Sequence, residues 1–404
     1  MYCVKNLKDD LYWIGGNERR IALFENIYPV PNGVSYNSYI MLDEKTVVFD
    51  TVDKSVSGVF FENIEHILDG RKLDYLIVNH MEPDHAATIE EVLLRYPDLT
   101  IVCNEKAAKM IKQYFNFDID SHVKLVKEMD VLNTGKHSLR FIMAPMVHWP
   151  EVMVTYDETD RVLFSADAFG TFGALNGNIF ADEVNFKSEW LSEARRYYAN
   201  IVGKYGPQVQ ALLSKAKTLD IDMVCPLHGP VWRKDISWFI EKYQKWSSYT
   251  PEENAITIVY ASIYGNTENA INIIASKLAD RGIKNIKIYD VSATHPSFII
   301  SEVFRCSHLV FASTTYNAGI FVNMETLINN IIAHNVRNRT IAIVENGSWA
   351  PTAGQLIRKK LSECKDITFL NNTISLRSAL KKDQVNLVEQ FVDEICDSIS
   401  KCSG

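Results

Sequence analysis

The chain has 404 residues, which at roughly 150 residues per domain favours two or three domains and excludes a single small module. Apolar residues make up 47% of the sequence and charged residues 23%, so the chain can bury cores and is not a disordered segment. With 42 Lys and Arg against 50 Asp and Glu, the formal net charge of -8 argues against a general surface for nucleic acid or an anionic membrane.

The seven cysteines are odd in number and never stand at C-x-x-C spacing, which argues against a disulfide framework, a zinc ribbon or a rubredoxin-type iron site. They are Cys3, Cys103, Cys225, Cys306, Cys364, Cys396 and Cys402. A thiolate-bound redox centre is therefore expected only on another chain. No apolar run approaches the roughly 18 residues of a membrane span, and none follows the N-terminal lysines. We expect a cytoplasmic protein.

Up to about Trp246, short β-branched runs alternate with turns and a few helices. Strands are predicted at 38–42, 46–50, 73–78, 99–103 and 139–143. A helical pattern over 232–246 ends at the polar stretch 247–254, which predicts a domain boundary. The predicted domains are residues 1–250 and 251–404.

After this boundary, strands and helices alternate strictly. Residues 255–260 form a nearly continuous apolar run, which is typical of a parallel strand covered on both faces. A helix is predicted from about Thr267, and further strands at 287–289, 309–312 and 340–344. This order predicts a doubly wound α/β domain of about 150 residues.

A cluster of potential metal ligands follows the strand that ends at Val78. The spacing H-x-E-x-D-H supplies His80, Glu82, Asp84 and His85. Because the segment directly follows a strand and is held by Pro83, these side chains can converge on a small volume. Three further candidates follow other predicted strands: His148, Asp167 and His228. Seven oxygen or imidazole ligands suit two metals with one bridging carboxylate better than they suit one metal.

Each of these residues also has a structural interpretation. A lone histidine is more often a core or surface residue than a ligand, and a lone Asp after a strand, such as Asp167, is usually a turn residue. Six histidines without ligand-like neighbours are assigned structural roles: His66, His122, His137, His295, His308 and His334. The seven candidates taken as a set are far harder to explain in this way.

The layout resembles the metallo-β-lactamase-like fold, and Glu82, where the hydrolases of that fold usually carry histidine, resembles the flavodiiron proteins. The intervals agree: 62 residues separate His85 from His148, 18 separate His148 from Asp167, and 60 separate Asp167 from His228. The resemblance implies an αββα sandwich with a non-haem di-iron site. It implies that His80, Glu82 and His148 hold one iron, that Asp84, His85 and His228 hold the other, and that Asp167 bridges them.

Glu82 provides an anionic carboxylate in place of an imidazole. Because this harder ligand favours iron over zinc and stabilises the ferric form, it is consistent with redox chemistry rather than hydrolysis. Met81 occupies a position where a small polar residue is common in the family, and its effect on access stays open.

Three loops of the second domain indicate a nucleotide site. The first, Ser262, Ile263, Tyr264, Gly265, Asn266 and Thr267, leads into a helix and can bind a phosphate, although alone it could be a capped helix. The others are Ser313, Thr314, Thr315, Tyr316, Asn317, Ala318 and Gly319, and Asn346, Gly347, Ser348 and Trp349. Such loops meet at the carboxyl edge of a doubly wound sheet.

Two aromatic residues, Tyr316 and Trp349, suit the flanks of a planar ring, with ordinary packing as the alternative for each. The domain resembles a short-chain flavodoxin, which implies FMN rather than FAD because no second nucleotide-binding unit is present. Tyr264 stands where many flavodoxins carry Thr or Ser, so a phosphate contact there must come from the backbone.

The resemblance spans almost the whole chain and implies an oxidoreductase in which electrons enter at FMN, pass to the di-iron centre and reduce a small gas. A two-electron flavin and two ferrous ions hold the four electrons that convert dioxygen to water, which ranks dioxygen first. Nitric oxide reduction to nitrous oxide, a metallo-hydrolase of the parent fold, and an electron carrier or gas sensor are the alternatives.

The chain ends at Gly404 without a C-x-x-C module, so we expect an external electron donor. The resemblance suggests a separate rubredoxin, or a reduced deazaflavin in some members. It also implies a head-to-tail homodimer or a dimer of dimers, with one subunit's flavin beside the other's irons. No nucleic-acid or membrane partner is expected.

Overall fold

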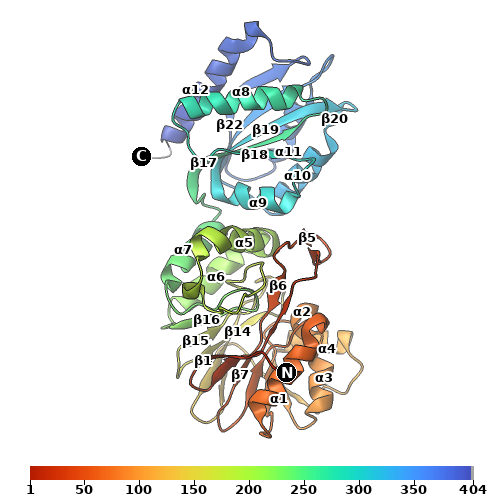
Figure 1. Ribbon diagram of the computed structural model, residues 1–404, viewed down its shortest axis with the longest axis vertical. Coiled ribbons are helices and arrows are strands. Elements are labelled where there is room, and N and C mark those ends of the chain that lie inside the picture. The colour runs from red at the N-terminus through yellow and green to blue at the C-terminus, as the bar shows by residue number, and fades with distance from the viewer. Residues whose placement is uncertain (402–404) are drawn as a thin grey trace. The chain divides into compact units, whose positions relative to one another are not determined.

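The computed structural model describes residues 1–401, and its internal contacts divide the chain into two compact units (Figure 1). The first unit comprises Met1–Tyr198 and Pro207–Gln244, and the second comprises Ala199–Gly206 and the chain from Lys245 onward. The boundary near residue 250 stays a prediction. None of the six cysteines within residues 1–401 forms a disulfide, and Cys402 lies outside the described residues.

Two sheets face each other in the first unit. The first sheet has the order β1 (Lys5–Lys8), β2 (Leu11–Trp13), β7 (Tyr39–Met41), β8 (Val47–Phe49), β9 (Tyr75–Ile77), β10 (Thr100–Cys103) and β11 (Val123–Leu125). The second has the order β12 (Val131–Asn133), β13 (Ser138–Met143), β14 (Met153–Asp157), β15 (Val162–Phe164) and β16 (Met223–Cys225). Their inner faces share one apolar core, in which the rings of Phe49 and Phe164 stack with centroids 3.7 Å apart.

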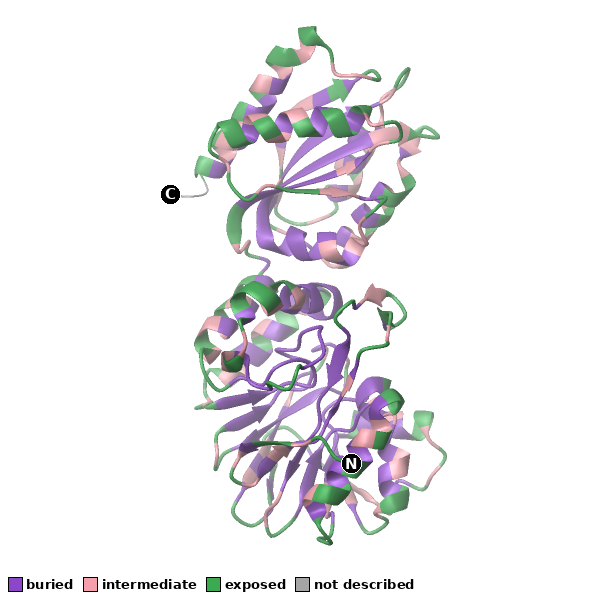
Figure 2. Ribbon diagram, in the orientation of Figure 1, coloured by how far each residue is buried: buried purple, intermediate pink, exposed green. Residues whose placement is uncertain are grey.

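Helices cover the outer faces of both sheets (Figure 1). On one side lie α1 (Ser57–Leu68), α3 (Ile89–Arg95) and α4 (Glu105–Tyr114), and on the other lie α5 (Leu191–Tyr197), α6 (Gly206–Ala216) and α7 (Ile236–Ser247). Strands β7, β8 and β16 are therefore buried along their whole length. Buried residues, drawn in purple, predominate in the strands of this unit in Figure 2. Two short strand pairs precede β7, namely β3 (Gly16–Glu18) with β6 (Val34–Tyr36), and β4 (Leu23–Phe24) with β5 (Tyr28–Pro29).

The second unit is built on a parallel sheet. Its order is β18 (Lys287–Asp290), β17 (Glu253–Ala261), β19 (Cys306–Tyr316), β21 (Arg339–Asn346) and β22 (Ile367–Leu376). One face packs on α8 (Asn266–Asp280) and α12 (Val385–Lys401), and the other on α9 (Pro296–Arg305), α10 (Val322–Ala333) and α11 (Ala353–Leu361) (Figure 1). The chain crosses to the other side of β17 after β18, and ligands bind at this kind of crossing in doubly wound sheets.

The structure differs from the sequence prediction in two places in this unit. Strand β22 was missed, because Asn371 and Asn372 interrupt its apolar pattern and it forms an edge of the sheet. Strand β19 runs on to Tyr316, past the predicted end at 312, because its last residues pair with β20 (Gly319–Ile320). Part of the expected loop 313–319 is therefore strand.

No helix within residues 1–401 combines the length and the apolar character needed to cross a bilayer.

Candidate functional site

The structure brings the seven predicted ligands together at the ends of strands in the first unit. The segment after β9 carries four of them, partly on the short helix α2 (Pro83–Ala86), while the others follow β13, β15 and β16. Their ligand atoms form two groups, each within 4.8 Å: His80, Glu82, His148 and Asp167, and Asp84, His85 and His228. All seven are buried except Glu82, which is intermediate.

Asp167 lies between the two groups. Its Oδ2 is 3.1 Å from Nε2 of His148 and 3.3 Å from Nε2 of His80. Its Oδ1 is 3.3 Å from Nε2 of His85 and 3.7 Å from Nε2 of His228. One carboxylate oxygen thus faces each group, which is the arrangement that a bridging ligand needs.

The donor atoms fit a pair of cations. Both carboxylate oxygens of Asp84 and Oδ1 of Asp167 are buried and accept no hydrogen bond from residues 1–401. Buried polar atoms without partners are costly, so these oxygens call for a positive charge. The Nε2 atoms of His85 and His228 also face each other at 3.0 Å. Imidazole and carboxylate donors together suit divalent transition metals. The roles of the seven as iron ligands stay a prediction.

The charged side chains of this cluster shift one another's pKa values. Burial alone would lower the pKa of His148, but Asp167 and Glu82 raise it to about 9. Burial alone would raise the pKa of Glu82, yet hydrogen bonds from His148 and His80 hold it well below its usual range. These contacts therefore favour the ionised form of Glu82 despite its burial.

The sequence analysis did not predict the residues that hydrogen-bond to the candidate metal-ligating side chains and orient them. Glu151 Oε1 lies 2.8 Å from Nδ1 of His80, and the backbone carbonyl of Ser35 lies 2.7 Å from Nδ1 of His228. Asp50 accepts the backbone N–H groups of Asn79 and His80 at 2.7 and 3.1 Å. Such partners usually fix the orientation of metal-bound histidines. Only Glu151 had a local signal, since it stands three residues after His148.

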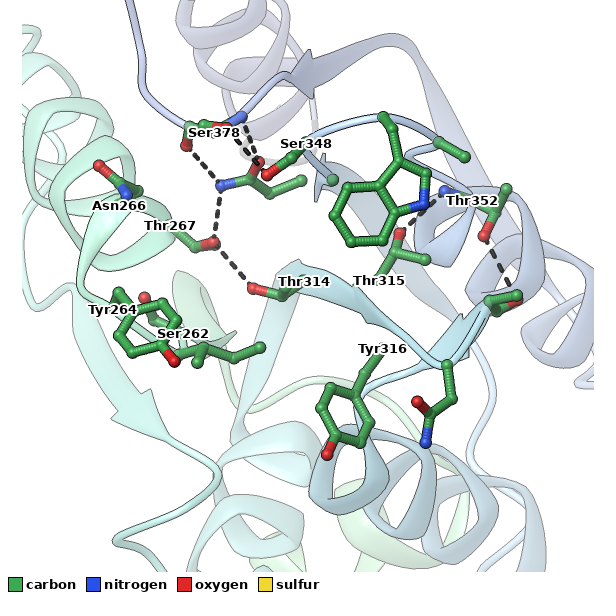
Figure 3. A pocket seen from close by; sticks show the side chains of 17 residues that line it. Ser262, Tyr264, Asn266, Thr267, Thr314, Thr315, Tyr316, Ser348, Thr352 and Ser378 are labelled. Atoms are coloured by element: carbon green, nitrogen blue, oxygen red, sulfur yellow. Dashed lines mark hydrogen bonds between the residues drawn. The ribbon is translucent and has the colours of Figure 1, made fainter.

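A cavity of about 540 Å³ lies at the carboxyl edge of the parallel sheet in the second unit (Figure 3). Most of the residues predicted to bind a cofactor line it. Gly265, Ser313 and Gly319 do not, while Thr352 and Ser378 do although the sequence did not indicate them. Ala350, at the end of the third predicted loop, also lines the cavity. The volume lies within the range of roughly 300–1,000 Å³ usual for small-ligand sites.

Asn346 ties the loops of this cavity together. Its side-chain amide donates to Oγ1 of Thr267 at 3.1 Å and to the carbonyl of Ser378 at 2.8 Å (Figure 3). Trp349 is 88% exposed and Tyr316 is 44% exposed, so neither serves mainly as core packing. Two exposed aromatic rings above a cradle of hydroxyl and amide groups suit a planar ligand with a phosphate tail.

Comparison with known proteins identifies the family of this chain. The family described as ODP family beta lactamase matches residues 34–229. An anaerobic nitric oxide reductase flavorubredoxin of Aeromonas hydrophila is 32% identical over 390 residues, which cover 95% of this chain and 77% of the relative. The chain belongs to the flavodiiron protein family. An uncharacterized protein of Methanocaldococcus jannaschii is 34% identical over 98% of each chain.

Solved structures agree with this membership. The rubredoxin oxygen:oxidoreductase of the anaerobe Desulfovibrio gigas has a TM-score of 0.91 at 24% identity, over 99% of each chain. The flavodiiron protein of Giardia intestinalis has the same score and identity, over 98% of this chain and 96% of the other. At this identity the likeness shows the fold. The predicted pairing of a metallo-β-lactamase-like sandwich with a flavodoxin-like sheet is thus confirmed. The family membership shown by the Aeromonas hydrophila relative makes this chain an oxidoreductase.

This chain has a third cluster of potential metal ligands, which we assign a structural role. Asp10, His137 and Asp160 lie within 4.8 Å of one another. However, Lys136 Nζ lies 3.1 Å from Asp10 and Lys8 Nζ lies 3.5 Å from Asp160. Because lysines already neutralise these carboxylates, the cluster does not call for a metal, although His137 has ligand-like neighbours that the sequence did not indicate.

His137 makes the stability of the flavodiiron protein depend on pH. Burial lowers its pKa, but Asp157 at 2.8 Å and Asp10 at 3.1 Å raise it from 6.5 to about 9. Because the folded-state pKa is raised, the stabilisation is complete below 6.5 and is lost as the pH rises through about 9. His137→Gln should cost roughly 3 kcal/mol at neutral pH. Urea unfolding from pH 6 to 10 should show a flatter profile for this variant, whereas the exposed control His66→Gln should follow the unaltered protein.

Proposed function

We propose that this flavodiiron protein binds two irons and FMN and reduces dioxygen to water with electrons from an external donor, in the cytoplasm. The position of Asp167, with Oδ2 facing His80 and His148 and Oδ1 facing His85 and His228, carries this proposal. When bound, the irons supply a redox centre for the gas, and FMN supplies electron transfer from the donor.

The chain's own residues provide the positions and the charges. His80, Glu82 and His148 would hold one iron, and Asp84, His85 and His228 the other. The anionic Glu82 favours iron and redox chemistry over hydrolysis. The amide and hydroxyl groups around Asn346, with Tyr316 and Trp349, would hold the flavin. The name of the Desulfovibrio gigas enzyme supports rubredoxin as the donor.

Nitric oxide reduction is the second candidate, because the Aeromonas hydrophila relative is named an anaerobic nitric oxide reductase. Dioxygen ranks first because two ferrous ions and a reduced flavin store the four electrons that it requires. Consumption of each gas should be measured in parallel with excess reduced rubredoxin, and a larger kcat/KM is expected for dioxygen. A larger value for nitric oxide would reverse the order, and ester hydrolysis without gas consumption would favour a hydrolase. Binding of either gas without turnover would favour a sensor.

We also propose a head-to-tail homodimer in which one subunit's flavin serves the irons of its partner. Tyr264 and Trp349 are 93% and 88% exposed at the cavity, which suits a surface that a second copy covers. Mixed dimers of an iron-deficient and a flavin-deficient variant should regain gas reduction that neither parent shows. Mixtures without activity would contradict this arrangement.

A further inference from the structure

The ligands themselves do not distinguish the two metal positions. Each group offers two histidines and one carboxylate of its own, and Asp167 directs one oxygen toward the histidines of each group. All four histidines present Nε2 to the carboxylates. Apart from the exchange of Glu82 for Asp84, the difference between the two positions lies in the residues behind the ligands.

Behind the first group lies a buried carboxylate. Glu151 is 0% exposed at its side chain, and its Oε1 accepts from Nδ1 of His80 at 2.8 Å and from the backbone N–H of Met81 at 2.9 Å. Its Oε2 is buried and has no hydrogen-bond partner within residues 1–401. The negative charge of Glu151 therefore lies beside the ring of His80 and the backbone of Met81.

Behind the second group, the corresponding partners are neutral or missing. Nδ1 of His228 donates to the backbone carbonyl of Ser35 at 2.7 Å. Nδ1 of His85 is buried and has no hydrogen-bond partner within residues 1–401. Asp50 is a further anion, but it approaches the first group again, through the backbone N–H of His80.

An anionic acceptor at Nδ1 makes the opposite ring nitrogen a stronger donor to a metal. Its charge also acts over a short distance at low dielectric, which favours the more positive oxidation state of that metal. Both effects act on the position that contains His80.

We propose that Glu151 is a positioning residue that makes the two irons unequal. The iron held by His80, Glu82 and His148 has the lower reduction potential, so it accepts its electron second. Each step is the one-electron reduction of a ferric ion to a ferrous ion. This inference rests on the di-iron part of the proposed function.

The test is a reductive titration of the iron- and FMN-loaded protein with dithionite, followed by electron paramagnetic resonance, without any gas substrate. Glu151→Gln keeps the size and the accepting oxygen but removes the charge. It should raise the lower of the two iron potentials, leave the higher one nearly unchanged, and reduce the fraction of half-reduced pairs. Glu151→Asp keeps the charge at a shorter reach and should shift the potential less.

The control is Glu105→Gln, which removes the same charge from the surface of α4, where Glu105 is 72% exposed. It should shift neither potential. A shift of the higher potential, equal shifts of both, or no shift in Glu151→Gln would overturn the proposal. So would failure of both Glu151 variants to hold two irons, because Glu151 would then build the site rather than tune it. An unaltered protein without two irons would instead overturn the proposed function.

Discussion

Replacing Asp167 with asparagine should remove both irons and abolish reduction of either gas. Its two oxygens lie between 3.1 and 3.7 Å from four histidine Nε2 atoms, and its side chain is 1% exposed. Asparagine keeps the shape but loses the anion that both metals would share. Since the loss of even an outer partner typically costs 10–100-fold in metal affinity or activity, loss of the bridge should lower gas reduction by more than about 100-fold.

Iron per chain and gas consumption should be measured together with FMN content. FMN content should stay unchanged, because the flavin cavity lies in the other unit. Asp220→Asn is the matched control, since the side chain of Asp220 is 76% exposed and forms a surface ion pair with Arg161. It should keep iron and activity. Full iron occupancy in Asp167→Asn would contradict the bridging role.

Replacing Asn346 with alanine should weaken FMN binding by about 10–100-fold, equivalent to about 1.4–2.7 kcal/mol. Asn346 is 5% exposed at the end of β21. It donates to Thr267 and Ser378 and accepts from the backbone N–H of Ser378 at 3.1 Å. Without these bonds the loops of the cavity lose their shared anchor, so FMN must order them as it binds.

The measurement is fluorescence titration of the flavin-free protein with FMN. Asn329→Ala is the matched control, because Asn329 is exposed on α10 and accepts one hydrogen bond from Lys360. It should bind FMN as the unaltered protein does. Iron content should be the same in both variants. Unchanged FMN affinity in Asn346→Ala would place the flavin elsewhere.

The metal cluster could be predicted because its signal is local. His80, Glu82, Asp84 and His85 stand within six residues directly after β9, and the remaining ligands each follow a strand. The flavin cavity could be predicted for the same reason, since loops after parallel strands meet at one edge. Ser378 lines the cavity from the loop after β22. It was missed because polar residues within β22 prevented the sequence analysis from recognising that strand.

The chemical class proposed for each site follows from the sequence, because the residue types and their positions directly after strands can be recognised there. The partners behind the ligands became visible only in the folded chain. Glu151 reaches His80 across 71 positions of sequence and Ser35 reaches His228 across 193. Such contacts depend on the tertiary packing, and even the position of Glu151 close to His148 in sequence does not reveal that it contacts His80. The inequality that we infer between the two metal positions arises from these contacts.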